Sequence, residues 1–500
     1  MGKDSTRPDK PGVLKKKKMR SVKVNAALNS IRTLMNILFP LITFPYVTRI
    51  LGTVNLGKIN YAQSIVSYFS LIAALGISTY ATREGARLRD YQSACNQFIN
   101  EVFTMNVITT AVSYGILFLL LVFADGLVPY RSLILILSLT VAFTTIGVDW
   151  INNLFEDYYY ITVRSIALQI VNIVLLFILI HRRDDYLLYA FLIVFTQVCT
   201  GILNVFYCRR YCKLRLTKLK KIKQHILPMA VFFANNLAVT VYCSADSTML
   251  GLIKGDHYVG IYAVATKVYT MIRSLLASVF AVCIPRLSNM AAKDEKKEFD
   301  SLLSTIIKGF MLVLIPAVAG LIVLARPIVL ILSGQDFVEA VPTLQILSVA
   351  LLFAIFGGIV TNCINIPLKM EKINLIATCV AAILNIVLNI FAIPIANQNG
   401  AAVTTVIAEF TVIVICVMKN RRFLKRLDKG VFRCGVESIV GGIIVFMAGS
   451  AIAVAIKNHI LMCLATFVSS ICLYAGMLLA VKEPLAYGVF KNITRRIRRK

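Results

Sequence analysis

Long apolar runs recur along the whole 500-residue chain and constrain its fold more than any other feature. Hydrophobic residues make up 58% of the sequence, and charged residues only 15%. About 20 apolar residues in a helix cross the hydrocarbon core of a membrane. Fourteen such runs can be placed, at residues 25–49, 57–80, 99–124, 131–150, 161–180, 186–207, 226–251, 258–284, 304–325, 340–366, 373–394, 399–418, 434–456 and 459–481. The sequence therefore predicts an all-α polytopic membrane protein with about 14 transmembrane helices.

The placement of the basic residues predicts which side of the membrane each loop faces. Charges near a span end, such as Arg164, are counted with the adjoining segment. On this count, 42 of the 53 Lys and Arg residues fall in segments on one side and 8 on the other, which leaves Arg32, Lys267 and Arg273 inside spans. Lys and Arg gather in cytoplasmic loops and contact anionic lipid headgroups. We therefore expect a multi-pass protein of the cell membrane with both termini in the cytoplasm. The net charge of +29 then needs no nucleic-acid partner.

A basic stretch near the middle divides the chain into two similar halves. The sequence LGTVNLGKINYA at 51–62 is echoed by LGLIKGDHYVGIYA at 250–263, which favours a duplicated bundle of the kind seen in secondary transporters. Two pseudo-symmetric six-helix bundles followed by two further helices fit the spans. The predicted parts are a basic tail (1–24), the N-terminal bundle (25–207), a basic linker (208–225), the C-terminal bundle (226–419), a basic loop (420–433), helices 13–14 (434–481) and a basic tail (482–500).

The three intramembrane cations form the principal candidate site. Arg32 shares a helical face with Asn25, Asn29 and Asn36. A charge at a helix centre costs roughly 2.5–3.5 kcal/mol on insertion scales, so such residues usually face a cavity or a partner. If the halves face each other, Arg32, Lys267 and Arg273 enter one cavity, where a diphosphate suits them. In the alternative interpretation, Asp246 or helix-end carbonyls pair with them as a structural network.

Acids and prolines inside the spans predict how transport is driven. Asp246, Glu409 and Asp149 are candidates for ion coupling, because intramembrane acids often carry proton or sodium relays, although each can also have an ordinary structural partner. Pro40 and Pro45 remove backbone donors from the first helix, so they predict either a hinge or a static kink.

The stretch DWINNLFEDYYYITVRS at 149–165 is the most distinctive polar segment between spans. Its aromatic residues, Trp150 and Tyr158–Tyr160, suit an interfacial belt. Glu156 and Asp157 lie in an inside segment with almost no basic residues. A gate contact and a bond to a neighbouring basic loop are both open for this acidic pair.

Cofactor motifs are weak along the chain, and we expect neither a cofactor nor a metal. The twelve cysteines show no repeated spacing, and there are four histidines. GTVNLGKI at 52–59 nearly matches a phosphate-binding loop, but Ile59 stands where that motif needs Ser or Thr. The stretch is also predicted to be a turn between two membrane helices, so we reject a nucleotide site there.

Several segments resemble those of bacterial polysaccharide transporters, in particular Wzx-type O-antigen and capsule repeat-unit flippases, and they occur in the order expected for that family. They are RILG and LGKINYAQS (49–64), DW and FEDYYYIT (149–162), SGQDFVEAVPTLQILS (333–348) and IPIANQNGAAVTTVIAE (393–409). The resemblance covers nearly the whole chain. It implies the fold of the multidrug/oligosaccharidyl-lipid/polysaccharide superfamily. It also implies that Arg32, Arg273 and Lys267 are cavity cations and that Trp150, Glu156 and Asp157 belong to a family motif.

The function that this resemblance implies is translocation of an undecaprenyl-diphosphate-linked oligosaccharide by alternating access, for surface polysaccharide export. Polysaccharide polymerase and other assembly proteins are the expected partners. An ion-coupled drug or metabolite antiporter of the same superfamily is the alternative, although a cavity for cationic drugs would favour acids. A membrane glycosyltransferase or polymerase needs a larger outside loop than the roughly 15 residues at 326–340, so we do not expect an enzyme.

Overall fold

The computed structural model describes residues 22–424, 426–428, 430–488 and 491. Most of the predicted tail at 1–24 and the end of the tail at 482–500 lie outside these residues. The first helices are α1 (Val22–Ala74), α2 (Ile77–Leu88), α3 (Gln92–Phe123), η1 (Asp125–Tyr130), α4 (Arg131–Ile146), α5 (Asp149–Leu154), α6 (Tyr158–Leu179), η2 (Arg183–Asp185), α7 (Tyr186–Cys208) and α8 (Leu219–Lys254). The later ones are α9 (Asp256–Ala277), α10 (Phe280–Ala292), α11 (Lys296–Ser333), η3 (Gln335–Phe337), α12 (Ala340–Ile359), η4 (Val360–Asn365), α13 (Glu371–Lys419), α14 (Arg421–Leu424), α15 (Gly430–Ala455) and α16 (His459–Ala480).

Twelve helical segments of the described chain are long and apolar enough to cross a membrane. Two of them contain non-helical backbone, at Gly52 in α1 and at Ala396 and Asn397 in α13, so each comprises two helical arms. The predicted spans 25–49 and 57–80 lie on the arms of α1, and 373–394 and 399–418 lie on those of α13. The prediction of a polytopic fold with about fourteen spans is thereby confirmed.

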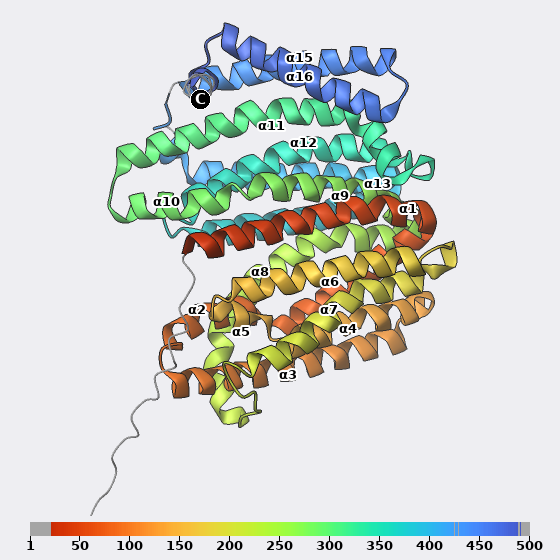
Figure 1. The fold of residues 1–500 in the computed structure, drawn as a ribbon, viewed down its shortest axis with the longest axis vertical. Coiled ribbons are helices and arrows are strands. Elements are labelled where there is room, and N and C mark those ends of the chain that lie inside the picture. The colour runs from red at the N-terminus through yellow and green to blue at the C-terminus, as the bar shows by residue number, and fades with distance from the viewer. Residues whose placement is uncertain (1–21, 425, 429, 489–490, 492–500) are drawn as a thin grey trace, which may run out of the picture. The chain divides into compact units, whose positions relative to one another are not determined.

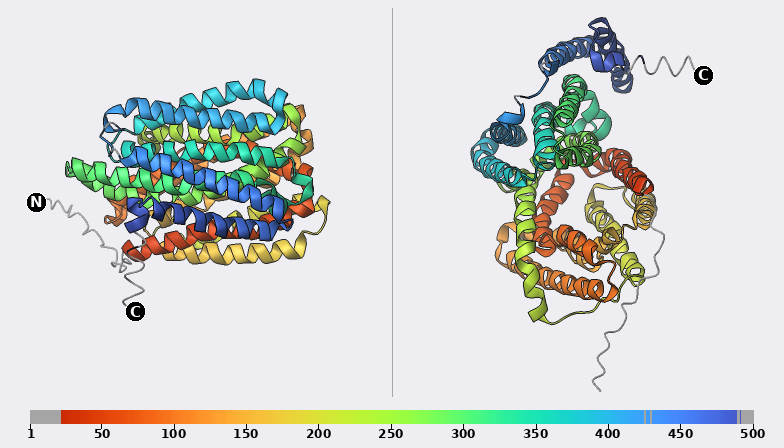
Figure 2. Two further views of the ribbon diagram at one scale, coloured as in Figure 1. Left: turned by 90° about the horizontal axis from the view of Figure 1, so that it is seen from above. Right: turned by 90° about the vertical axis from the view of Figure 1, so that its left-hand side faces the viewer.

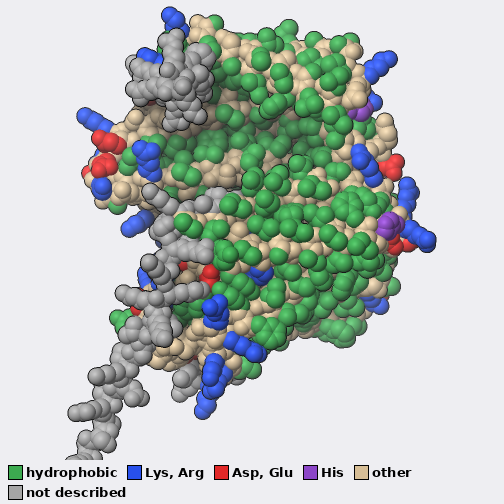
Figure 3. Space-filling model, viewed as in Figure 1, with side chains coloured by type: hydrophobic (Ala, Val, Ile, Leu, Met, Phe, Trp, Pro, Cys, Tyr) green, Lys and Arg blue, Asp and Glu red, His purple; other side chains and the backbone are tan. Residues whose placement is uncertain are grey.

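The side chains on the visible face agree with a membrane setting. Hydrophobic side chains cover the middle of the helices in Figure 3, and most charged side chains of that face gather at the helix ends. Many large apolar side chains are exposed, among them Phe123, Phe391 and Val454. Such a surface suits lipid contact, because burial in hydrocarbon removes it from water.

The chain divides into two compact units. Unit 1 comprises Met1–Thr43 and Lys58–Ser244, and unit 2 comprises Phe44–Gly57 and Ala245–Lys500. In unit 1, α7 packs against both α4 and α6, and α2 packs against α5. In unit 2, α11 packs against α12, α15 and α16, and α12 also packs against α9 and α13 (Figures 1 and 2). The division into bundles at 25–207 and 226–419 stays a prediction.

Two glycine turns explain the sequence echo between the halves. Gly52 has φ 71° and ψ −179°, and Gly255 has φ 90° and ψ −178°. This region of backbone conformation is essentially open to glycine alone. Each is followed five residues later by a second glycine, Gly57 and Gly260. The echo is therefore a repeated turn geometry, in which Gly52 corresponds to Gly255.

Gly57 and Gly260 let the two repeated segments approach each other closely in unit 2. A Cβ at Gly57 would lie 1.8 Å from the carbonyl oxygen of Asp256, and one at Gly260 would lie 1.9 Å from that of Thr53. Small residues permit such close helix contacts in membrane proteins. No larger residue fits at either position without moving the backbone.

Candidate functional site

Asp246 of α8 is a buried carboxylate that uncharged groups surround. Its side chain accepts hydrogen bonds from Tyr262 Oη (2.6 Å), Thr405 Oγ1 (2.7 Å) and Asn389 Nδ2 (2.6 Å). The residue is 6% exposed, and no described cation lies within ion-pair distance of it. An ionised carboxylate inside a membrane protein needs compensation, and neutral donors supply only part of it. The arrangement suits a group that exchanges a proton or a small cation.

A second layer of polar groups holds the donors of Asp246 in place. Asn389 Nδ2 also donates to Asn385 Oδ1 (3.2 Å), and Asn389 Oδ1 accepts from Thr404 Oγ1 (2.6 Å). The Thr404 and Thr405 hydroxyl oxygens also lie 2.8 and 3.0 Å from the carbonyl oxygen of Ala401, which is the alternative acceptor for each hydroxyl hydrogen. The amide and carbonyl oxygens of this layer are ligands that hard cations prefer. The sequence analysis singled out Asp246 alone, although Asn385 and Asn389 lie one helical turn apart in the sequence.

Arg273 is paired with Glu409, not with Asp246. Arg273 Nη1 lies 2.8 Å from Glu409 Oε1, and Tyr269 Oη accepts from Arg273 and donates to Glu409, both at 3.2 Å. The Glu409 side chain is 4% exposed, whereas that of Arg273 is 37% exposed. Glu409 was predicted to couple ions, and its position makes it the counter-ion of Arg273. The exposed part of the guanidinium is accessible to a ligand.

Lys267, which precedes Tyr269 by two residues and Arg273 by six, faces an aromatic ring. Its Nζ lies 5.9 Å from the ring centroid of Phe44, on the α1 segment that belongs to unit 2. A cation over an aromatic face gains about 0.5–2 kcal/mol. No described acid forms an ion pair with Lys267, so its charge is held without neutralisation.

Arg32 lies in the first arm of α1, in unit 1. The Leu28 carbonyl accepts from Thr162 Oγ1 (3.2 Å), and Asn36 Oδ1 accepts from Gln169 Nε2 (2.8 Å). Since Leu28, Arg32 and Asn36 are spaced by four residues, Arg32 lies on the face of α1 that contacts α6. It is half-buried and has no hydrogen-bond or ion-pair partner among the described residues. The side chains of Asn25 and Asn29 lie outside those described.

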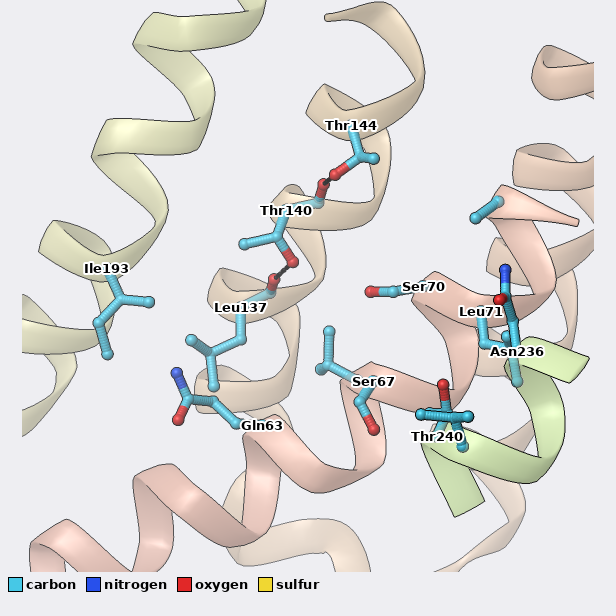
Figure 4. A pocket seen from close by; sticks show the side chains of 13 residues that line it. Gln63, Ser67, Ser70, Leu71, Leu137, Thr140, Thr144, Ile193, Asn236 and Thr240 are labelled. Atoms are coloured by element: carbon cyan, nitrogen blue, oxygen red, sulfur yellow. Dashed lines mark hydrogen bonds between the residues drawn. The ribbon is translucent and has the colours of Figure 1, made fainter. Parts of the chain in front are cut away.

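A pocket of 540 Å³ with mixed polar and apolar lining lies within unit 1 (Figure 4). Four helices line it: α1 supplies Gln63, Val66, Ser67, Ser70, Leu71 and Ala74; α4 supplies Leu137, Thr140 and Thr144; α7 supplies Ile193; and α8 supplies Asn236, Val239 and Thr240. None of these lining residues is charged. The sequence analysis missed this pocket, although its polar residues recur at helical spacing, as in Thr140 and Thr144.

Hydroxyl groups in the pocket are partly committed to their own helices. Thr144 Oγ1 donates to the Thr140 carbonyl and Thr140 Oγ1 to the Leu137 carbonyl, both at 2.7 Å (Figure 4). Each hydroxyl oxygen retains acceptor capacity toward the pocket. A neutral lining of apolar side chains with several hydroxyls and amides suits an uncharged ligand that has both apolar and polar faces.

Asp149 has a structural partner, Arg164 of α6. Arg164 Nη2 lies 3.1 Å from Asp149 Oδ1, and Asn204 bonds to both side chains. The sequence analysis counted Arg164 with an inside loop, but the residue is buried at 6% exposure. Asp149 is therefore the acid of an ion pair inside unit 1, which weakens its candidacy for ion coupling.

The remaining residues of this segment pack into unit 1. Trp150 is 4% exposed inside the core, so its ring contacts neighbouring helices of the unit, and its place in an interfacial belt stays a prediction. Glu156 forms an ion pair of 2.8 Å with Arg89, a residue of the neighbouring basic segment. Asp157 accepts from Tyr207 (2.7 Å) and from Tyr211 (2.5 Å). These contacts fix the segment, and a gate role for it stays a prediction.

Pro40 and Pro45 lie within helical backbone of α1. The boundary between units 1 and 2 falls at Thr43 and Phe44, between the two prolines. Each proline removes one backbone hydrogen bond and weakens the helix locally. The weakened stretch of α1 thus coincides with the place where the chain passes from one unit to the other.

Known proteins of two kinds share sequence or fold with this chain. A protein of Shigella dysenteriae named "Putative O-antigen transporter" is 24% identical over 76% of this chain and 94% of its own length. A Haloferax volcanii protein named "Probable low-salt glycan biosynthesis flippase Agl15" is 25% identical over 51% of this chain and 53% of its own. These names agree with the expectation of a transporter that is not an enzyme.

Solved structures show the same fold. The lipid II flippase MurJ in an inward closed conformation matches with a TM-score of 0.72 and 15% identity, over 93% of this chain and 99% of its own. An inward-facing transporter of the multidrug MATE family matches with a TM-score of 0.59 and 15% identity, over 80% and 98%. The chain therefore has the polytopic transporter fold that the sequence resemblance implied.

The family itself follows from a match to a family model over residues 22–291, more than half of the chain. The model describes polysaccharide biosynthesis proteins. The matched region runs from the start of α1 to the end of α10, so it includes Arg32, Asp246, Lys267 and Arg273. This chain belongs to the polysaccharide biosynthesis protein family.

Proposed function

We propose that this protein is a flippase that moves an undecaprenyl-diphosphate-linked oligosaccharide from the cytoplasmic to the outer leaflet of the cell membrane. The observation that carries the proposal is membership of the polysaccharide biosynthesis family in a chain with a polytopic transporter fold. Relatives named as an O-antigen transporter and a glycan flippase support it. Both termini lie in the cytoplasm, and polysaccharide assembly proteins use the exported product.

The chemistry of the candidate sites suits the two polar parts of such a substrate. Arg32, Lys267 and Arg273 bind the diphosphate, since guanidinium groups form paired bonds to phosphate oxygens and an ammonium adds a compact charge. The neutral pocket of unit 1 accepts sugar hydroxyls, which need both donors and acceptors. The polyprenyl tail stays in the hydrocarbon core of the membrane, so it is never transferred into water.

Replacing Arg32 with alanine is expected to reduce surface polysaccharide export by about tenfold or more, since a hydrogen bond to a charged group contributes about 1.5–3 kcal/mol. Membrane levels should stay normal, because Arg32 has no described partner that the change would strand. The measurement is polysaccharide on cells that carry the variant as their only copy, with Arg326→Ala as the control for an exposed cation. Full export by the Arg32 variant would contradict the proposed site.

Alternating access requires a helix that changes shape, and we place the hinge at Pro40 and Pro45. The double variant Pro40→Ala/Pro45→Ala restores two backbone donors, so translocation in proteoliposomes should slow severalfold while substrate binding is retained. Pro394→Ala, which changes another proline within a helix, is the control. An unchanged rate in the double variant would leave the prolines as a static kink.

Asp246 couples transport to an ion gradient in this proposal. Of the three acids that the sequence suggested, Glu409 and Asp149 have arginine partners, whereas the donors to Asp246 are neutral. The alternative function, drug or metabolite antiport, shares the fold. A deletion strain distinguishes the two, because loss of surface polysaccharide with unchanged drug sensitivity supports the flippase, and the reverse supports the antiporter.

A further inference from the structure

A second pocket lies in unit 1, between α3 and the segment that follows α7. Its volume is 410 Å³, and its lining consists of Gln92, Asn96, Asn100, Arg209, Arg210, Tyr211, Cys212, Lys213 and Arg215. Four of these side chains are cationic, three are amides, and none is acidic. The charge pattern predicts that this end of the helices faces the cytoplasm. The composition separates this pocket from the neutral one described above.

The half-buried Tyr211 and the buried Cys212 anchor the basic segment. Tyr211 donates a 2.5 Å hydrogen bond to Asp157, and its ring stacks on Phe155 with a centroid distance of 4.3 Å. Burial and the hydrogen bond to Asp157 raise the pKa of Tyr211 above its usual range, so the hydroxyl remains a donor. Cys212 is buried in the core of unit 1. The cationic residues on either side of this pair are thereby held at the surface.

The next residues run alongside α3 without regular secondary structure. The backbone nitrogen of Arg215 donates to Asn100 Oδ1 (2.8 Å), and that of Thr217 donates to Thr104 Oγ1 (2.9 Å). Leu214 packs on the core, whereas Lys213 and Arg215 are exposed. On the facing helix, Gln92, Asn96 and Asn100 recur every four residues and so present three amides on one side.

The four cations of the pocket are not neutralised by the protein. Arg209, Arg210, Lys213 and Arg215 form no ion pair with any acid in the described part of the chain. The Arg209 guanidinium lies 5.1 Å from the ring centroid of Phe206, and that of Arg210 lies 5.2 Å from Tyr207. Like charges around one pocket repel each other, and this repulsion is relieved when an anion binds among them.

We propose that this pocket binds a phosphate-bearing anion. Arginine forks and a lysine ammonium match phosphate oxygens, and the amides of Asn96 and Gln92 add neutral donors. The ligand chemistry can come from the headgroup of an anionic phospholipid or from a water-soluble phosphate compound. The site is separate from the intramembrane cations and does not depend on the proposed transport activity.

The test uses the full-length protein in two lipid settings. In nanodiscs of phosphatidylcholine, titration with inorganic pyrophosphate is followed by calorimetry. In a second arm, the midpoint of thermal unfolding is compared between phosphatidylcholine discs and discs of equimolar phosphatidylcholine and phosphatidylglycerol. Saturable pyrophosphate binding identifies a soluble source, and stabilisation confined to the phosphatidylglycerol discs identifies a headgroup. Either result supports the site, and the absence of both overturns it.

A matched pair of variants separates the pocket from general surface charge. The triple variant Arg209→Gln/Lys213→Gln/Arg215→Gln should weaken pyrophosphate binding, or abolish the lipid effect, by about tenfold or more. The control Lys293→Gln/Lys296→Gln/Lys297→Gln removes the same charge from exposed residues of unit 2 and should change either readout less than about twofold. Equal losses in the two triple variants would overturn the proposal.

An uncharged substitution keeps the test valid if the triple variant folds poorly. Asn96→Leu removes an amide of the lining and leaves every charge in place. It should weaken binding by severalfold, because a lost neutral hydrogen bond contributes about 0.5–1.5 kcal/mol. The variant Arg215→Lys preserves the charge but changes the geometry of the contact. If binding is unchanged both in this variant and in Asn96→Leu, the pocket does not hold phosphate through specific contacts, and the proposal is contradicted.

Discussion

The variant Arg273→Ala is expected to lose both stability and export. Removing the guanidinium leaves Glu409, which is 3% exposed, as a buried carboxylate without its cation. Breaking a buried ion pair in this way costs about 3–5 kcal/mol. The lower end applies here, since the Arg273 side chain is more than a third exposed. The midpoint of thermal unfolding of the purified protein should fall, and its level in the membrane should drop with it.

A double variant separates the structural role of Arg273 from a role in substrate binding. Arg273→Met with Glu409→Leu removes both charges, so no buried charge is stranded and stability should return. Export should remain at background if Arg273 contacts the diphosphate. Arg433→Met with Glu437→Leu removes another ion pair of unit 2, joined at 2.7 Å, and should leave export intact. Normal export in the Arg273 double variant would reduce that arginine to a counter-ion of Glu409.

The variant Asp246→Asn is expected to abolish the response of transport to an ion gradient. The amide keeps the size of the side chain, so the cluster with Tyr262, Thr405 and Asn389 should survive with little loss of stability. It cannot carry a negative charge, and therefore it cannot exchange a proton or balance a bound cation. Coupling free energies of about 1–3 kcal/mol correspond to roughly 5- to 150-fold changes in affinity. We expect the gradient to change transport by the unsubstituted protein within that range, and to have no effect on the variant.

The measurement is uptake of labelled lipid-linked oligosaccharide into proteoliposomes under a proton or a sodium gradient, imposed one at a time. One gradient should accelerate the natural protein and leave Asp246→Asn unaffected. Glu101→Gln is the control, because Glu101 is likewise a buried acid that amides contact, from Gln97 and Gln224, although it also bonds to His225 and belongs to unit 1. A variant Asp246→Asn that still follows the gradient would remove Asp246 from the coupling step.

The sequence was sufficient to predict the fold because hydrophobicity acts locally. Each membrane span needs a continuous apolar run, and such a run is visible without knowledge of any other segment. Gly52 and Gly255 were likewise visible as an echo, although only the backbone angles reveal that they form the same turn. The break in the helical backbone of α13 at Ala396 and Asn397 falls between two predicted spans, because one apolar run ends and the next begins there.

The candidate sites were predictable only in part, because partners in space are distant in the sequence. Glu409 lies 136 positions after Arg273, and no local pattern joins them. The cationic residue Arg164 was assigned to a loop, since a single charge at the edge of an apolar run carries no sign of its burial. Asp246 was identified from its depth alone, whereas its hydrogen bond from Asn389, 143 positions later, is visible only in the structure.

A short piece of α1, Phe44–Gly57, belongs to unit 2, whereas the rest of the helix belongs to unit 1. This division affects the order in which the protein is assembled. The segment Phe44–Gly57 bonds to unit 2 through Thr48 to the Leu332 carbonyl and through Arg49 to the Ile331 carbonyl. These partners are synthesised 284 and 282 residues later. During translation the first helix therefore waits in the membrane until α11 has been inserted, with Arg49 lacking its Ile331 partner and Thr48 bonded only to carbonyls of its own helix. A nick in the linker after α7 would leave each fragment without a part of its own unit, so the two halves of the polypeptide are not independently folding pieces.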